Sequence, residues 1–578
     1  MVVFLAYVPC LNHDFVNWDD DVHLLKNEAL RSLHWDNVRQ IFLQTVNKIY
    51  VPLTTLTFAI EYQFFHFDPF VYHFDNLILH LGVVLLVFWF ASLCGLTQRG
   101  ALFAAMVFGL HPIHVESVAW VTERKDVLCS FFYLAALCFY IHYLRSKRTI
   151  LFFAVILLSL LSVLAKPMAL SLPLVLLVCD YFFQRYLNRR VIFEKLYLGI
   201  ILSPVVWMTY LSHVRLPGSS VMESVLVWVW CFIFYIKKFF IPYDFFLLYK
   251  LPKPILISNF SYGEAAVIFI LVLWALFNFH RLRWLIFAFA FYAASIFFVL
   301  RFDNASDANV VADRFMYIPS VGFCLLLGVA YEAILIDFPR LEKLNKGFYK
   351  SRFTIAAIHS IILAVLIGLF IETSSQIRVW RNGITLWEHQ LKYRPAVAEA
   401  LVYNKLAAAY SEETGFKRLV NAHRGSLKRF ASKQILLGTT DRNVIEKIQR
   451  VMLLYKRAIK IKPDYDEAYY NLGRLYGEMD MPQTAGRLYQ AAIRINPRYI
   501  DAYLAIAKTY EQLGDAGQAV ATYWKALAVY PEYEGLYKNI MADLNMALFN
   551  ASSDKREVYK EAYRKISMAF TQYLIHRK

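Results

Sequence analysis

The sequence predicts an all-α protein, with a polytopic membrane domain of about eleven transmembrane helices followed by a C-terminal α-solenoid. Three observations lead to this fold class. Hydrophobic residues make up 58% of the 578 residues and charged residues only 18%, against roughly 25% charged residues in soluble domains. Apolar runs near bilayer length recur through the first two thirds of the chain. A repeat occupies the last third.

The apolar runs locate the membrane-spanning segments, since a helix needs about 20 apolar residues to cross a bilayer. The first run, Val2–Leu11, is shorter than that, so the first helix is predicted to be incomplete or to begin upstream of this sequence. The predicted spans are roughly 1–12, 75–97, 100–112, 126–144, 150–165, 168–184, 192–212, 262–279, 284–300, 314–336 and 353–373.

Basic loops between the spans predict their orientation, because short cytoplasmic loops are enriched in Lys and Arg. This pattern accounts for the net charge of +17 without a nucleic-acid partner. An even number of crossings must separate two cytoplasmic loops. Between Arg190 and His280 lie two clear spans and a third apolar stretch, Val221–Ile241, so this stretch is predicted not to cross. The alternative is a miscounted helix. The loops predicted to be cytoplasmic are Gln98-Arg99, Arg145–Arg148, Gln184–Arg190, His280–Arg283 and Pro339–Arg352.

The remaining polar segments fall on the outer side, which is the periplasm of a bacterium or the lumen of a eukaryotic compartment. A reaction site is therefore expected on this face. Three formal glycosylation sequons, at Asn259, Asn304 and Asn550, are too few to distinguish these compartments. The outer segments are Asn12–Val51, His111–Asp126, Lys166-Pro167, Pro242–Ser261, Arg301–Arg314 and everything after Ile377.

A 34-residue period after residue 395 predicts tetratricopeptide repeats (TPR), each a pair of helices. Pro463, Pro497 and Pro531 follow this spacing. The predicted domains are a membrane domain over 1–375, a connecting segment over 376–397 and a TPR domain over 398–578. Within the TPR domain we predict a basic insertion at about 412–442 and capping helices from about 534. The insertion carries Lys417, Arg418, Arg424, Lys428, Arg429 and Lys433, which suit either anionic lipid or solvent.

Two adjacent carboxylates, Asp19 and Asp20, follow the first apolar run. Acids at a bilayer surface are costly unless they are hydrated or have a role. One acid of such a pair could act as the general base for a hydroxyl acceptor, because the like charge of its neighbour raises its pKa toward a useful range. Alternatively, the two acids could hold a divalent metal ion. The alternative is a solvated acidic loop.

A second polar cluster precedes the span at 126–144. His111 and His114 suit zinc by residue type, but they lack the HExxH spacing of a zinc protease and no Cys or third His is placed to help. We expect them to be supporting residues, with zinc binding as the alternative. Arg124 and Lys125 could bind a phosphate group. The alternative is that the charged residues pair with one another and cap the helix that starts at Asp126. The cluster also contains Glu116, Glu123 and Asp126.

Three further charged residues, Lys166, Asp313 and Arg314, begin or end predicted spans on the outer side. The cations Lys237-Lys238, in the stretch predicted not to cross, also face outward. Acids and cations converging on one outer face suit a reaction whose leaving group is a lipid phosphate.

Ordered sequence blocks make the chain similar to the transmembrane and TPR-containing O-mannosyltransferase family, and more closely to its bacterial members. The resemblance covers nearly the whole chain, and the blocks at 110–120 and 123–126 are the most specific. The blocks are Phe15–Asp20, Tyr50–Thr54, Tyr72-His73 with His80, Leu110–Trp120, Glu123–Asp126, Lys166–Met168 with Asp180-Tyr181, Ala312–Pro319, and Trp380–Asn382 with Leu386-Trp387.

The resemblance implies a GT-C class glycosyltransferase in a bacterial cytoplasmic membrane rather than the endoplasmic reticulum. The sugar, such as mannose, would come from a polyprenyl- or dolichyl-phosphate donor and pass to a protein hydroxyl, with the acceptor held in the TPR groove. Asp19 or Asp20 would be the base, and Arg124, Lys125, Lys166 and Arg314 the phosphate contacts. The alternative function is a non-catalytic membrane-anchored TPR scaffold.

Overall fold

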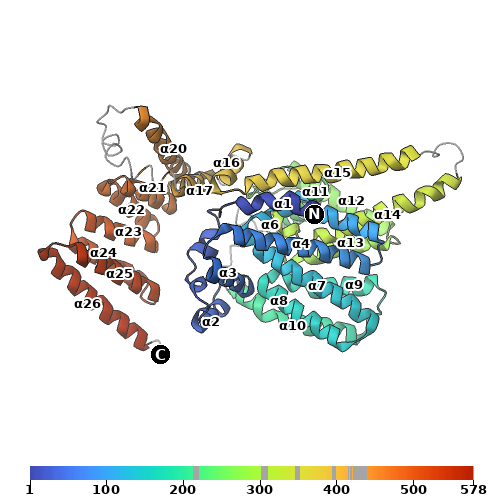
Figure 1. Cartoon of the computed structure of the whole chain (residues 1–578), viewed down its shortest axis with the longest axis horizontal. Helices are drawn as coiled ribbons and strands as arrows, with labels where there is room; N and C mark the ends of the chain where they lie inside the picture. The colour runs from blue at the N-terminus through green and yellow to red at the C-terminus, as the bar shows by residue number, and fades with distance from the viewer. Residues whose placement is uncertain are drawn as a thin grey trace. The chain divides into compact units, whose positions relative to one another are not determined.

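Every regular element in the described part of the chain is a helix, as the sequence predicts. The computed structural model describes residues 1–211, 220–300, 310–344, 352–393, 399–413, 416, 420 and 439–576. It divides into a first unit, Met1–Gln390, and a second unit, Leu391–Lys578 (Figure 1). This division falls within the predicted connecting segment 376–397.

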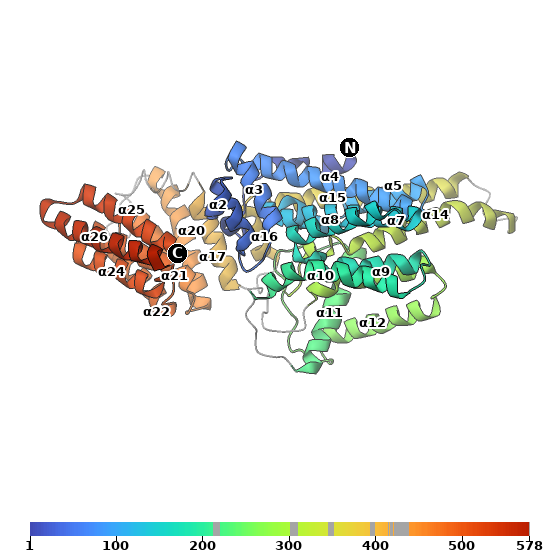
Figure 2. The same ribbon diagram turned by 90° about the horizontal axis from the view of Figure 1, so that it is seen from below.

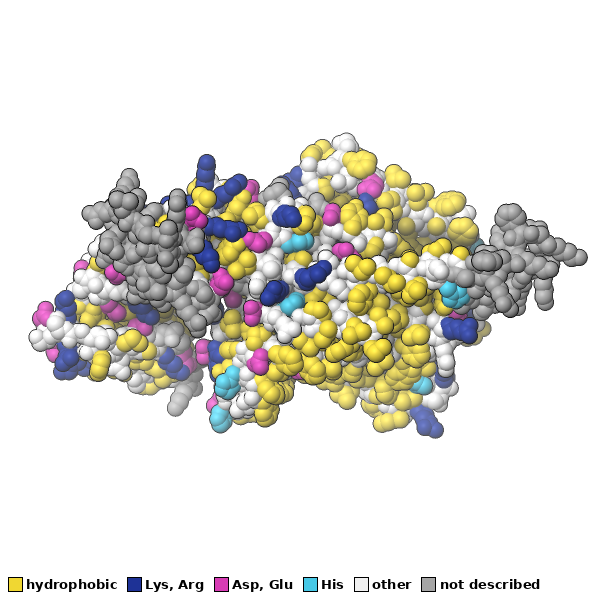
Figure 3. All heavy atoms as spheres, turned by 45° about the horizontal axis from the view of Figure 1, so that its top comes forward, with side chains coloured by type: hydrophobic (Ala, Val, Ile, Leu, Met, Phe, Trp, Pro, Cys, Tyr) yellow, Lys and Arg dark blue, Asp and Glu magenta, His cyan; other side chains and the backbone are white. Residues whose placement is uncertain are grey.

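The first unit is the membrane domain. Hydrophobic side chains cover a broad part of its surface (Figure 3). Its helices are α1 (Val2–Tyr7), α2 (Trp35–Leu43), α3 (Pro52–Phe65), α4 (Pro69–Leu93), α5 (Gln98–Leu110), α6 (Val115–Ala119), α7 (Arg124–Ser146), α8 (Thr149–Ala165), α9 (Leu172–Phe182), α10 (Arg189–Leu211), α11 (Val221–Phe240), α12 (Phe260–Asn278), α13 (Arg283–Ile296), α14 (Ser320–Leu344), α15 (Arg352–Val379) and α16 (Gly383–Tyr393).

Four stretches of described helix are long and apolar enough to cross a membrane: Pro69–Leu93, Val121–Ser146, Phe260–Asn278 and Ala357–Val379. A fifth results if Gln98–Leu110 and Pro112–Ala119, which meet at a bend of 52°, form one span. The shorter apolar helices are Val2–Asn12, Thr149–Ala165, Pro167–Phe182, Arg283–Val299 and Ser320–Ile334. A membrane protein is therefore indicated, but the predicted count of about eleven spans is not confirmed.

Prolines explain why some apolar runs are divided. The residue before a proline is disfavoured in the α conformation. α5 accordingly ends at Leu110, with His111 extended before Pro112, and α8 ends at Ala165, with Lys166 extended before Pro167. Both breaks bring charged or polar side chains into the candidate site described below.

The stretch predicted not to cross forms α11. Glu223, Lys237 and Lys238 lie within its 20 residues, and it is not among the helices apolar enough to span. Lys237 pairs with Glu264 of α12 at 2.7 Å. Lys238 donates to the carbonyl oxygens of Tyr243 and Asp244, each at 2.6 Å.

The second unit is an α-solenoid of helix pairs with the predicted period (Figure 2). The first residues of α21, α23 and α25 are Asp466, Ile500 and Glu534, which are spaced by 34 residues. α25 also begins where we predict the capping helices to begin. The helices are α17 (Glu399–Glu412), α20 (Thr439–Ile461), α21 (Asp466–Glu478), α22 (Pro482–Ile495), α23 (Ile500–Gln512), α24 (Ala516–Val529), α25 (Glu534–Asn550) and α26 (Ser553–His576).

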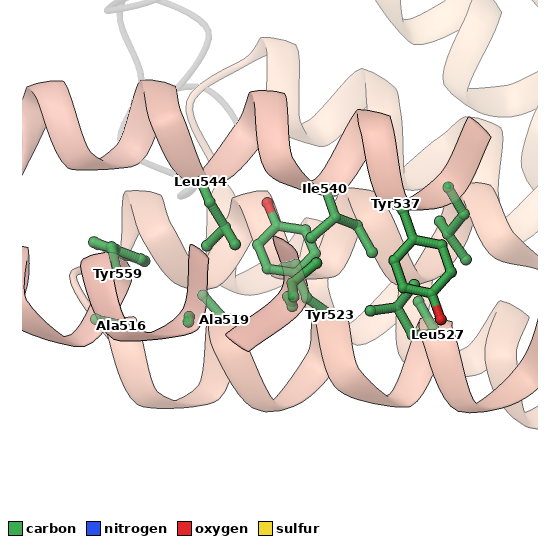
Figure 4. Close-up of a cluster of buried hydrophobic side chains, with 13 residues drawn as sticks. Ala516, Ala519, Tyr523, Leu527, Tyr537, Ile540, Leu544 and Tyr559 are labelled. Carbon is green, nitrogen blue, oxygen red and sulfur yellow. The ribbon is translucent and has the colours of Figure 1, made fainter. Parts of the chain in front are cut away.

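Small and aromatic side chains build the core of this unit. Figure 4 shows Tyr523 of α24, Ile540 and Leu544 of α25, and Tyr559 of α26 gathered in one buried cluster. α26 thereby covers an apolar face that α24 and α25 would otherwise expose, as a capping helix must. The insertion cations predicted from the sequence, Lys417 to Lys433, lie outside the described residues, as does the sequon at Asn304.

Candidate active site

The structure gives the two adjacent acids of the first loop different roles. Asp20 is 1% exposed. Its Oδ2 accepts a hydrogen bond from Val16 N at 2.9 Å. Its Oδ1 accepts from Trp120 Nε1 at 2.9 Å, from Thr122 N at 3.1 Å and from the Thr122 hydroxyl. Asp20 therefore fastens the first loop to the segment that precedes α7.

Burial raises the pKa of Asp20 to about 7, although the hydrogen bonds from Thr122, Val16 and Trp120 act in the opposite direction. Asp19 is only half-buried, and its Oδ1 accepts from Asn47 Nδ2 at 3.2 Å. Asp19 is thus the more solvent-accessible of the two acids.

A divalent ion at the Asp19–Asp20 pair would compete with hydrogen-bond donors for Asp20. The hydrogen-bond donors around Asp20 already engage both of its carboxylate oxygens. Among the described residues, no group of three or more His, Cys, Asp or Glu side chains is placed to hold a metal ion.

Tryptophans from the end of the first unit hold the same loop in place. Trp387 Nε1 donates to Asn17 Oδ1 at 2.9 Å, and its ring meets that of Trp18 edge-on at 5.4 Å. Trp380 stacks on Trp120 with 5.5 Å between ring centroids. The sequence block at 380–387 therefore supports the acidic loop from a distance of several hundred residues along the chain.

A buried ion network lies at the start of α7. Glu123 is its centre, since its two carboxylate oxygens lie 3.2 Å from Lys125 Nζ, 3.2 Å from Lys166 Nζ and 3.4 Å from Arg314 Nε. Lys166 Nζ also lies 2.6 Å from Asp126 Oδ1. The predicted residues Glu123, Lys125, Asp126, Lys166 and Arg314 are thus brought together.

Glu116 completes this network from the other side. It accepts from Arg314 N at 3.0 Å and pairs with the Arg314 guanidinium group. The side chains of Lys166 and Arg314 are 12% and 17% exposed, whereas those of Glu116, Glu123 and Asp126 are at most 4% exposed. Lys166 and Arg314 are therefore the least buried members of this network.

Arg124 does not join this network, although it was predicted with Lys125 as a phosphate contact. Its Nε donates to Asn76 Oδ1 and its second terminal nitrogen to Tyr72 O, each at 2.7 Å. It also pairs with Glu61 and is 1% exposed. Arg124 instead fastens the start of α7 to α3 and α4, and the structure does not bring it together with Lys166 and Arg314.

His111 and His114 have structural partners at all four ring nitrogens. His111 Nε2 lies 2.9 Å from Phe239 O, and Ile113 N donates to His111 Nδ1 at 3.2 Å. His114 Nδ1 lies 2.8 Å from Phe108 O, and its Nε2 lies 2.9 Å from the hydroxyl group of Ser320. These histidines hold the bend between α5 and α6, which positions Glu116.

Asp313 borders a narrow crevice beside the network. Tyr249 OH donates to its Oδ2 at 2.6 Å, while its Oδ1 is buried without a hydrogen-bond partner. Glu116 and Trp380 line the same crevice. Burial raises the pKa of Asp313 to about 6, and Lys238 opposes this increase.

Sequence reasoning did not identify His23, whose ring interacts electrostatically with Lys125 and Glu123. His23 is 2% exposed, and its Nε2 has no hydrogen-bond partner. Burial, reinforced by Lys125, lowers the pKa of His23 to about 3, so the ring is neutral. Its position three residues after Asp20 was the only available signal. Glu61 and Asn76, the partners of Arg124, were also missed.

Comparisons with known proteins agree with both units. The second unit matches the family models "TPR repeat" over residues 453–480 and "Tetratricopeptide repeat" over residues 500–533. A protein O-mannosyl-transferase of Caenorhabditis elegans is 24% identical over 437 residues, which cover 68% of this chain and 57% of that protein.

Two human proteins are also similar. Protein O-mannosyl-transferase TMTC4 is 32% identical over 171 residues, covering 25% of this chain and 23% of that protein. Protein O-mannosyl-transferase TMTC3 is 39% identical over 101 residues, covering 18% of this chain and 11% of that protein.

The chain is a TPR-containing relative of the protein O-mannosyl-transferases. The family resemblance predicted from the sequence blocks is therefore confirmed. The chain spans 57% or less of the length of these curated O-mannosyl-transferases. Among solved structures, a crystal structure of MamA aligns with 33% of this chain and 88% of its own at 19% identity and a TM-score of 0.22.

Proposed function

We propose that this protein is an inverting GT-C glycosyltransferase that transfers a hexose, such as mannose, from a polyprenyl-phosphate donor to a protein hydroxyl group. It would act on the outer face of a bacterial cytoplasmic membrane, with about eleven membrane crossings. One observation carries the proposal. Asp20 connects the loop of the more accessible acid Asp19 to Trp120 and Thr122, immediately before the ion network.

In the proposed reaction, Asp19 removes the proton from the acceptor hydroxyl group. The hydroxyl oxygen forms a bond to the anomeric carbon of the sugar while the bond from that carbon to the phosphate oxygen breaks. Negative charge therefore develops on the departing lipid phosphate. Lys166 and Arg314 are the least buried cations of the network and would stabilise this charge.

Asp20 would act on the reaction only through the position of Asp19. Its two oxygens are occupied by donors from Val16, Trp120 and Thr122, so it is a positioning residue. His23 and Lys125 would support the network, since both are buried. The TPR unit would bind the acceptor protein, in keeping with the use of TPR surfaces for protein recognition.

The test uses purified full-length protein, a polyprenyl-phosphate-mannose donor and a Ser/Thr-containing acceptor, with transferred hexose measured by mass spectrometry. We expect Asp19→Asn to lower the transfer rate at least 100-fold without changing thermal stability. Asp36→Asn is the matched control, since Asp36 is an exposed acid in the same outer segment. Full activity of the Asp19→Asn variant would show that Asp19 is not the base.

Arg314→Gln and Lys166→Gln test the leaving-group contacts. Removing one group that stabilises developing charge typically lowers the rate by about 100- to 1000-fold. We expect each variant to lose transfer activity by a factor of this order. Arg281→Gln, which changes an exposed arginine in a predicted cytoplasmic loop, should retain the wild-type rate.

A non-catalytic TPR scaffold is the second candidate function. All three cations of the network, Lys125, Lys166 and Arg314, already pair with carboxylates. A donor phosphate would have to compete with these carboxylates, which favours a protein that binds no donor. Donor binding distinguishes the two functions. Wild-type protein that binds no polyprenyl-phosphate sugar, yet captures proteins through its TPR unit, would be a scaffold.

A further inference from the structure

An apolar groove lies between α8 and α10, away from the candidate active site. The two helices pack side by side (Figure 1). α8 has 17 residues and is therefore about 25 Å long. Lys166 of the ion network follows its C-terminal end, whereas the groove contacts its first turn through Phe152. The groove thus opens at the opposite end of the membrane domain.

The lining of this groove suits a hydrocarbon chain. The groove is shallow, and its volume is about 790 Å³, which is within the usual range for small-molecule pockets of about 300–1,000 Å³. Its apolar residues are exposed, with Phe193 at 65% and Ile200 at 69%. The apolar lining consists of Phe152, Phe193, Leu196, Tyr197 and Ile200.

Positive charge gathers at the same end of the groove. Arg190 lines it, and its side chain is 74% exposed. Arg189 is also exposed and begins α10. Arg148 is exposed, precedes α8 and lies one turn before Phe152. Both helix N-termini add partial positive charge at this position.

Glu194 also lines the groove and pairs with Arg190, but it is shared with a second arginine, Arg185. Glu194 lies 3.5 Å from Arg190 Nε. Glu194 is already held by two Arg185 nitrogens at 2.7 and 3.0 Å, and by Tyr143 OH at 2.8 Å. The other carboxylate of this cluster, Asp180, pairs with Lys195 at 2.5 Å. Two acids are thus balanced by Arg185 and Lys195, and the arginines at the groove remain in excess.

We infer that this groove binds an anionic phospholipid of the surrounding bilayer. One acyl chain lies along Phe193 and Ile200, and the phosphate contacts Arg190 with Arg148 and Arg189 nearby. Charge complementarity selects the occupant, because a zwitterionic lipid would bring its own cation to the arginines. The site is independent of the proposed transferase activity.

The test is native mass spectrometry of detergent-purified full-length protein titrated with phosphatidylglycerol or phosphatidylcholine. We expect phosphatidylglycerol to bind at least tenfold more tightly. Arg189→Gln/Arg190→Gln should weaken phosphatidylglycerol binding by more than tenfold, or roughly fivefold for each charge removed. Phe193→Ala should weaken it without altering the charge.

Matched controls separate this site from general lipid contact. Arg281→Gln removes an exposed arginine of another basic loop, and Phe277→Ala removes an 80% exposed aromatic residue from α12. Both should bind phosphatidylglycerol as the wild type does, and a thermal unfolding measurement checks that each variant is folded. Equal binding of the two lipids would overturn the inference, as would equal effects of the groove and control variants. Undecaprenyl phosphate that displaces phosphatidylglycerol and binds this site more tightly would also overturn it.

Discussion

Replacing Asp20 tests whether this carboxylate holds the first loop in place or acts as the general base. Asp20→Asn keeps the shape of the side chain but loses one acceptor. If the amide oxygen faces Trp120 and Thr122, the amide nitrogen faces the N–H group of Val16, so one of the hydrogen bonds is lost. Asp20→Ala removes the acceptor entirely and leaves several buried donors without a partner.

The magnitudes follow from the hydrogen bonds. At pH 8, where Asp20 is mostly ionised, a hydrogen bond to this charged acceptor contributes about 1.5–3 kcal/mol, and a buried donor left unpaired costs about 1–3 kcal/mol. We expect Asp20→Asn to lower the free energy of unfolding by about 2 kcal/mol and Asp20→Ala by about 5 kcal/mol. At about 2 °C per kcal/mol for a large domain, the melting temperature falls by about 4 °C and about 10 °C.

The assay is thermal unfolding in detergent, followed by tryptophan fluorescence, together with the transfer rate. Asp36→Asn is again the matched control, because its exposed side chain should leave the melting temperature unchanged. The reasoning is refuted if Asp20→Ala melts like the wild type but abolishes transfer. That result would make Asp20, and not Asp19, the base.

The pH dependence of the same variants gives a second test. Burial raises the folded-state pKa of Asp20 to about 7, above its ordinary value near 3.8. The folded protein therefore binds more protons than the unfolded chain between these values, and its stability falls as the pH rises through this window. The stability advantage of wild type over Asp20→Asn should be larger at pH 5 than at pH 8. If the stability advantage of wild type instead grows with pH, the hydrogen bonds that lower the pKa of Asp20 have a larger effect than the burial that raises it.

Two further predictions concern packing. Arg124→Gln should lower the free energy of unfolding by about 3–5 kcal/mol because it leaves Glu61 buried without its cation, and adding Glu61→Gln should restore part of the melting temperature. Gly473→Ala in the TPR unit should cost about 1–3 kcal/mol, since the new Cβ would lie 2.7 Å from the Tyr489 ring. Gly477→Ala, whose Cβ would meet its nearest atom at 3.7 Å, is the control and should not destabilise the unit in thermal unfolding.

The fold could be predicted from the sequence to the extent that it depends on local periodicity. The 34-residue spacing correctly predicted the helix pairs, whose first helices begin at Asp466, Ile500 and Glu534. The number of spans was less predictable, because several predicted apolar runs form helices shorter than a bilayer span, such as Thr149–Ala165 and Arg283–Val299. By length and composition, the described residues contain four helices able to cross the membrane, or five if the bent pair is one span.

The candidate site was predictable in composition but not in geometry. The sequence grouped Arg124 with Lys125, yet neighbouring positions on a helix point about 100° apart. Arg124 consequently pairs with Glu61 of α3, while Lys125 faces Glu123 in the network. His23 was missed because a buried histidine without a hydrogen-bond partner at Nε2 has no sequence signature.

By itself, the sequence determined the two-part organisation, the repeat class and the family, because apolar runs, a fixed period and ordered motifs are all properties of the linear chain. Only the tertiary structure decided the roles of the charged residues. Asp20 and Trp120 are 100 positions apart and Glu116 and Arg314 are 198 apart, so their pairing depends on how the helices pack. Packing buries Asp20 beneath donors and leaves Asp19 within reach of solvent, which distinguishes two identical neighbouring side chains.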